Sequence, residues 1–174
     1  MLTIGHSNRG LPDFLELLKE HRVELLVDVR TVPKSRHNPQ FNRESLPESL
    51  ATENIRYEHL PGLGGLRHAR KDSPNSGWKN LSFRGYADYM LTREFEESLD
   101  VLIERDRQAR TVIMCAEAVP WRCHRSLVAD ALTVRGVPVA HILSAKPPQP
   151  HRITSFAHVE GTRVTYPAEN LRLF

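Results

Sequence analysis

Short apolar runs alternate along this chain with segments whose apolar residues recur at helical spacing. Runs of strand length occur at residues 2–6, 24–30, 55–60, 111–115 and 137–143. Helical spacing occurs between them, over residues 12–18, 85–106 and 121–135, and more weakly over 44–53. This alternation is typical of βαβ units. It predicts a single three-layer α/β domain over residues 1–174, with a mainly parallel sheet of about five strands flanked by helices.

Local signals mark where several of these elements begin and end. Pro12 suits the first turn of a helix, Thr92 is a capping residue for a helix that starts at Arg93, and Gly136 ends the helical segment before it. Residues 61–84 have no clear period, so we expect a long binding loop or lid there. Residues 146–174 form a C-terminal extension of uncertain structure that begins with a proline-rich break, and for its last 24 residues we expect a hairpin or an edge strand.

Composition narrows the class of protein. Hydrophobic residues make up 40% of the 174 residues and charged residues 26%, which is typical of a globular protein. The apolar runs are too short for a membrane span, and the first residues lack the features of a signal peptide, so we expect a cytoplasmic protein without a membrane partner. In that compartment Cys115 and Cys123, the two cysteines, are expected to be reduced.

Chemically useful residues follow four of the predicted strands. They are His6, Ser7 and Arg9 after the first strand, Asp28 and Arg30 after the second, His59 after the third, and Cys115 and Glu117 after the fourth. The carboxyl ends of parallel strands meet at one edge of a sheet, where ligands bind in open α/β folds. The sequence therefore predicts one shared site at this edge.

The densest of these segments runs from Cys115 to Arg125, from the end of a strand into the first turn of a helix. A Cys123 thiol near a helix N-terminus and beside Arg122, His124 and Arg125 is expected to ionise easily. The same surroundings suit an anion. Three chemistries stay open: a nucleophilic thiolate, metal binding by the cysteines with His124 and His6 or His59, and general acid–base catalysis by Glu117 or Asp28.

Spacing weakens two of these assignments. A phosphatase-like loop counted from Cys115 needs arginine at position 121, where tryptophan stands, and Arg122 comes one residue late. The two cysteines are separated by seven residues, unlike the short ligand spacing of common structural zinc sites, so no metal ligand is assigned and the cofactor is left open.

Basic and aromatic residues concentrate in two loops. Of the 24 basic residues 19 are arginine, the side chain that grips phosphates and carboxylates with a planar fork. One loop spans residues 34–41. The other, residues 61–84, carries basic residues together with Trp78 and Phe83, with Tyr86 just beyond it. Aromatic faces beside positive charge favour a nucleotide-like, otherwise phosphorylated or nucleic-acid ligand.

Several motifs carry a family resemblance. They are GHSNR, LVDVR, PKSRHNPQF, the Y-x-H-L-P-x-L-G-G segment, FRGYADYM, and above all CAE-x-x-P-x-x-CHR followed by a helix and VAHI, between residue 3 and about residue 143. In these the chain resembles the domain-of-unknown-function 488 family. The resemblance implies a small α/β domain of bacteria and archaea, and its motif positions fall on His6, Asp28, Arg30, Glu117, Cys123, His124 and Arg125. It implies no particular reaction.

Our leading hypothesis is an enzyme that acts on a nucleotide-like or other phosphorylated or anionic substrate. Its expected catalytic residues are Glu117, Cys115, Cys123, His124, Asp28 and His6. Its expected ligand-binding residues, an arginine-rich anion-binding set, are Arg30, Arg122, Arg125, His59, Ser7 and Arg9. The alternatives are a nucleic-acid-binding module without turnover and a thiol protein with redox activity. The substrate, the reaction and the oligomeric state are left open.

Overall fold

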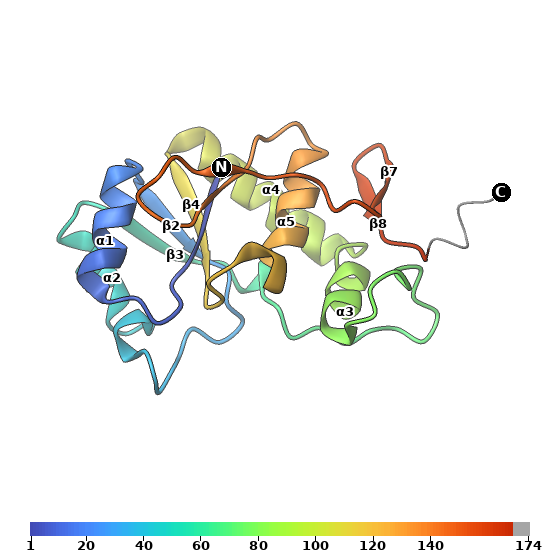
Figure 1. Cartoon of the computed structure of the whole chain (residues 1–174), viewed down its shortest axis with the longest axis horizontal. Coiled ribbons are helices and arrows are strands. Elements are labelled where there is room, and N and C mark those ends of the chain that lie inside the picture. Colours follow the sequence, from blue (N-terminus) through green and yellow to red (C-terminus); the bar gives the residue numbers. More distant parts are fainter. Residues whose placement is uncertain (169–174) are drawn as a thin grey trace.

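The computed structural model describes residues 1–168, and its centre is a six-stranded sheet (Figure 1). The strands are β1 (Leu2–Gly5), β2 (Leu25–Asp28), β3 (Arg56–His59), β4 (Thr111–Cys115), β5 (Ala140–Ile142) and β6 (Gln149–Pro150). They are ordered β3-β2-β4-β1-β5-β6, and every neighbouring pair is parallel except β5 and β6. The predicted mainly parallel α/β sheet is therefore confirmed.

Helices connect the parallel strands. They are α1 (Leu11–Glu20), α2 (Leu46–Ala51), α3 (Leu81–Tyr89), α4 (Arg93–Gln108) and α5 (Arg125–Thr133). Short 3₁₀ turns occur at η1 (Pro39–Phe41), η2 (Pro61–Leu63) and η3 (Pro120–Arg122). Within residues 1–168 no helix has both the length and the apolar character needed to cross a membrane.

Each face of the sheet has its own hydrophobic core, which explains the three layers. Phe14 of α1 and Leu50 of α2 pack with Met114 on one face. On the other face, Leu99 of α4 and Leu127 of α5 pack with Ile113, the residue before Met114 in β4. Successive strand residues point to opposite faces, so β4 is buried on both sides.

The helical segment expected over residues 85–106 is in fact two helices. The chain leaves α3 at Met90 and starts α4 at Arg93, where the Thr92 hydroxyl accepts a hydrogen bond from the Phe95 amide at 3.3 Å. The predicted cap at Thr92 and the helix expected from Arg93 are confirmed, and the helical residues before them belong to the separate helix α3. The helix expected from residue 121 begins only at Arg125, since residues 120–122 form a 3₁₀ turn.

The C-terminal extension contains the hairpin expected in its last 24 residues, and it adds a strand inside the proline-rich break. Strand β6 pairs antiparallel with β5 at the edge of the sheet, and β7 (His158–Glu160) pairs with β8 (Arg163–Thr165) in a separate hairpin. Asp130 of α5 holds the extension in place: it accepts hydrogen bonds from the His151 ring, the Thr154 hydroxyl and the Tyr166 hydroxyl at 2.7, 2.7 and 2.8 Å. The part of the extension beyond residue 168 lies outside the described residues.

Candidate functional site

The residues expected at one site divide between the two faces of the sheet. Asp28 lies on the same face of the sheet as Leu26 and contacts Tyr57 on the α1–α2 side. Cys115 lies on the opposite face, the same one as Ile113, in the core on the α5 side. The chemistry of the strand ends is thus arranged as two groups rather than one.

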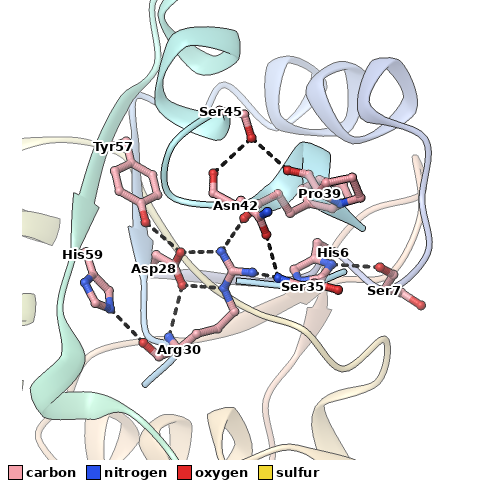
Figure 2. A network of polar contacts seen from close by, with 11 residues as sticks. His6, Ser7, Asp28, Arg30, Ser35, Pro39, Asn42, Ser45, Tyr57 and His59 are labelled. Atoms are coloured by element: carbon pink, nitrogen blue, oxygen red, sulfur yellow. Dashed lines mark hydrogen bonds and ion pairs between the residues drawn. The ribbon is translucent and has the colours of Figure 1, made fainter. Parts of the chain in front are cut away.

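The group on the α1–α2 side is a buried ion-pair network (Figure 2). The Arg30 guanidinium donates to both Asp28 carboxylate oxygens, at 2.9 and 2.6 Å, and to the Phe41 carbonyl oxygen at 2.6 Å. Asp28 also accepts from the Arg30 amide at 3.1 Å and from the Tyr57 hydroxyl at 2.8 Å. With its carboxylate fully buried and holding four hydrogen bonds, Asp28 positions Arg30 and the chain around Phe41 and is not free to act as a general base.

His6 joins this network from the end of β1. Arg30 Nη1 lies 3.2 Å from His6 Nε2, and His6 Nδ1 lies 2.8 Å from the Ser7 carbonyl oxygen, which assigns the ring proton to Nδ1. The ring also stacks on Phe41, with centroids 4.4 Å apart. Burial lowers the pKa of His6, so the neutral ring is the form that the fold selects.

The group on the α5 side, here called the thiol cluster, consists of Cys115, Cys123 and His124. Both sulfur atoms lie near one ring nitrogen, since His124 Nδ1 is 4.0 Å from Cys115 Sγ and 3.8 Å from Cys123 Sγ. The three atoms lie within 4.8 Å of one another, and both cysteines are buried and free of a disulfide. Among residues 1–168 these are the side chains placed to hold a metal ion.

The thiols of this cluster have unlike acidities. The Cys123 thiol and the His124 ring lower the pKa of Cys115 by hydrogen bonding, against the effect of burial, and the positive charge of Arg125 adds to this lowering. Burial raises the pKa of Cys123. Cys115 is therefore the sulfur that ionises first, with Cys123 as the neighbouring thiol that donates to it.

Two cavities open beside the strand ends, and they share Glu117 as a common wall. The first, of about 260 Å³ and here called the thiol pocket, is lined by the thiol cluster together with Glu117, Arg122 and Tyr86. The second, of about 390 Å³ and here called the basic hollow, is lined by residues that include His6, Ser7, Arg30, Lys34, Ser35 and Glu117. Glu117 and Arg122 are exposed, so both are available to a ligand.

Four of the expected ligand-binding residues are engaged within the protein, the first being Arg30 in its pair with Asp28. Arg125 is 1% exposed and donates to the Ile4 carbonyl oxygen, so its charge acts on the neighbouring thiols rather than on a bound anion. Arg9 donates to the Gly5 and Leu143 carbonyl oxygens at 3.3 and 2.9 Å. His59 contacts the Arg30 carbonyl oxygen at 2.8 Å (Figure 2).

The aromatic residues of the 61–84 region also differ from expectation. Tyr86 is buried and donates to the Leu63 carbonyl oxygen at 2.7 Å, and Trp78 packs against Phe83 and Phe156 with centroid distances of 4.8 Å. Trp78 and Tyr86 are thus parts of internal packing rather than free platforms for a base. Phe83 and the buried Tyr86 both line the thiol pocket, whereas Trp78 does not.

Two residues of the site were not among those expected from the sequence. Tyr57 donates to Asp28, and Gly65 lies so close to His124 that an added Cβ would come within 3.1 Å of Nδ1. The alternation of residues 55–60 carried a signal for Tyr57, because it identifies the core-facing positions of that strand. Gly65 carried one in its place at the end of the Y-x-H-L-P-x-L-G-G segment, but its contact with His124 depends on packing across the fold.

The fold and the site together define a small parallel α/β domain with a Cys-Cys-His cluster beyond one strand end and a buried Asp-Arg pair beyond its neighbour. The chain belongs to the family described as Domain of unknown function DUF488, whose profile matches residues 10–132. His6, Ser7 and Arg9 precede the matched range, and the thiol cluster lies within it. The searches of curated proteins and of solved structures returned no match.

Proposed function

We propose that this protein is an enzyme that acts on an anionic, phosphorylated substrate of nucleotide-like size, bound across the thiol pocket and the basic hollow. The observation that carries the proposal is that the two cavities share Glu117. One cavity holds the groups able to react and the other holds basic and hydroxyl groups. Their volumes lie near the lower end of the range for small-molecule sites, about 300–1,000 Å³.

The roles follow from exposure and charge. Lys34 and Arg122 are exposed cations on either side of Glu117, and no carboxylate pairs with them among residues 1–168. They are the anion-binding side chains of the proposal. Glu117, exposed between the cavities, is the acid–base group, and Cys115 with His124 is the reacting centre.

The test separates binding from turnover. A panel of inorganic phosphate and nucleoside phosphates is screened for binding by changes in NMR chemical shift and for product formation by mass spectrometry. Replacing Lys34 and Arg122 together by alanine is expected to weaken binding at least about tenfold, because a charged hydrogen bond contributes about 1.5–3 kcal/mol. Glu117→Gln is expected to keep binding and lower turnover by about 10²- to 10⁴-fold.

Arg56→Ala is the matched control, since Arg56 is an exposed arginine at the start of β3, on the opposite edge of the sheet. It is expected to change neither quantity. Equal losses in this variant and in the Lys34 and Arg122 double variant would contradict the placement of the site. The absence of any binding across the panel would contradict the substrate class.

A nucleic-acid-binding module is the second candidate, supported by exposed Lys34, Arg36 and Lys71 in the two basic loops. Two other basic residues of these loops are engaged internally: Arg67 lies 3.6 Å above the Tyr89 ring and Arg70 pairs with Asp72 at 2.7 Å. A module of this kind would lose affinity for a short oligonucleotide steeply as salt rises, because each phosphate contact releases counterions. Its affinity would be unchanged or tighter in Glu117→Gln.

A further inference from the structure

The nitrogen-to-sulfur distances in the thiol cluster are a few tenths of an ångström longer than the edges of a tetrahedral metal site. With zinc–sulfur distances near 2.3 Å and zinc–nitrogen distances near 2.0 Å, the ligand atoms of tetrahedral zinc are separated by about 3.5 Å for sulfur to nitrogen and about 3.8 Å for sulfur to sulfur. His124 Nδ1 lies 4.0 Å from Cys115 Sγ and 3.8 Å from Cys123 Sγ, and no pair among the three atoms is more than 4.8 Å apart. One cation placed between the three atoms would contact both sulfurs and the nitrogen at once.

The surroundings of the cluster orient its atoms toward one point. His124 Nε2 lies 3.3 Å from the Val29 carbonyl oxygen, and a hydrogen donated there leaves the Nδ1 lone pair facing the sulfurs. The Arg125 amide lies 3.5 Å from Cys123 Sγ and donates to it. Metal-bound histidines commonly donate their second ring hydrogen to a carbonyl group in this way.

Space is left at the cluster on the side of the thiol pocket. Gly65 faces His124, and a Cβ there would lie 3.1 Å from Nδ1 and 3.4 Å from Cε1. The pocket of about 260 Å³ adjoins the cluster and exposes Glu117 and Arg122 to the same space. Three protein ligands beside an open pocket is the arrangement of catalytic zinc sites, whereas structural sites are closed by a fourth ligand.

We propose that Cys115, Cys123 and His124 bind one zinc ion whose fourth coordination position opens into the thiol pocket. Thiolate and imidazole ligands in a tetrahedral arrangement select zinc over the hard cations magnesium and calcium. The inference goes beyond the proposed function: with zinc bound, Cys115 and His124 would act as ligands of the ion, and metal binding is measured without any substrate.

The direct test is metal content. The full chain is purified under reducing conditions without chelators, and zinc is measured by mass spectrometry; we expect about one ion per chain. Replacing zinc by cobalt is expected to produce the sulfur-to-cobalt charge-transfer bands and the ligand-field bands of a tetrahedral site. Zinc affinity is measured in competition with a chromophoric chelator.

Variants locate the ion. Cys123→Ser and His124→Gln each remove a ligand and are expected to weaken zinc binding by at least about 100-fold. Gly65→Ala keeps all three ligands but crowds His124, and it is expected to weaken zinc binding by about tenfold. His68→Gln, a change at an exposed histidine of the same loop, is the matched control and is expected to keep full zinc content. Circular dichroism melting confirms that each variant is folded.

Two results would overturn the proposal. One is a reduced, folded protein that binds neither zinc nor cobalt. The other is unchanged zinc content in folded Cys123→Ser and His124→Gln, which would place the ion elsewhere. Failure of the phosphate panel with zinc bound would refute the proposed substrate class alone, and phosphate binding by a folded, reduced protein that takes up neither zinc nor cobalt would refute the zinc site alone.

Discussion

A buried histidine makes the stability of this protein depend on pH in a defined direction. His141 of β5 is 5% exposed and forms part of a hydrogen-bonded chain. The Thr3 hydroxyl lies 2.8 Å from His141 Nδ1, His141 Nε2 lies 3.0 Å from His151 Nδ1, and His151 Nε2 lies 2.7 Å from the Asp130 carboxylate. Because His151 donates to Asp130, His141 must donate to His151 and accept from Thr3, which requires a neutral His141 ring.

The size of this pH effect on stability follows from the shift in the pKa of His141. Burial, the neighbouring His151 and Arg125 lower the pKa of His141 from 6.5 to about 4. Between these two pH values His141 is protonated in the unfolded chain and neutral in the folded chain, so the free energy of unfolding falls as pH falls. With about 1.36 kcal/mol per pKa unit, the linkage amounts to about 2 kcal/mol lost between pH 7 and pH 5.

The assay is urea unfolding of the wild type and of His141→Gln at pH 7 and pH 5. Gln can donate to His151 and accept from Thr3 but does not titrate. We expect the wild type to lose about 2 kcal/mol more than the variant over this interval, or roughly 1 M in the urea midpoint. The buried His6 contributes equally to both proteins and cancels. His37→Gln, at an exposed histidine, should behave as the wild type. Equal pH dependence in wild type and His141→Gln would refute the reasoning.

Three further predictions concern the elements that hold the site. Asp28→Asn leaves the buried Arg30 guanidinium without its counterion and is expected to cost about 3–5 kcal/mol in urea unfolding; a loss below 1 kcal/mol would contradict the ion pair. Gly5→Ala drives a Cβ into the Glu117 carbonyl group and is expected to cost about 1–3 kcal/mol, whereas Gly10→Ala, whose nearest neighbour would be 3.4 Å away, should be near neutral. Asp130→Ala removes the shared acceptor of the C-terminal extension, so limited proteolysis should cut after residue 145 first; an unchanged cleavage pattern would argue against this anchor.

The strands and their order along the chain could be predicted because they depend on local patterns. The buried runs at β2 and β4 and the Thr92 cap are read from a few neighbouring residues, and the structure has them where expected. The break between α3 and α4 was harder to predict, since apolar residues continue through Met90 and Leu91. There a tertiary contact, Tyr89 donating to the Gly62 carbonyl oxygen at 2.6 Å, holds the end of α3.

The face on which each candidate residue lies could not be predicted from the sequence. A strand that alternates apolar and polar residues reveals its two faces, but β2 and β4 are apolar on both and show no such alternation. Only the assembled sheet places Asp28 against Tyr57 and Cys115 against α5. Arg125 was expected to bind an anion, but the packing of α5 against β1 buries it and directs its guanidinium to the Ile4 carbonyl oxygen.

The sequence by itself determined that reactive side chains follow the strands of a parallel sheet, because strand length, helical period and the residues after each run are local properties. The tertiary structure decided which of them meet. Cys115 and Cys123 are separated by seven residues of turn, and His124 reaches both sulfurs only because the Val29 carbonyl group of a neighbouring strand end and Gly65 of a distant loop shape its surroundings. Such contacts depend on how the chain packs across the sheet, and no local pattern encodes them.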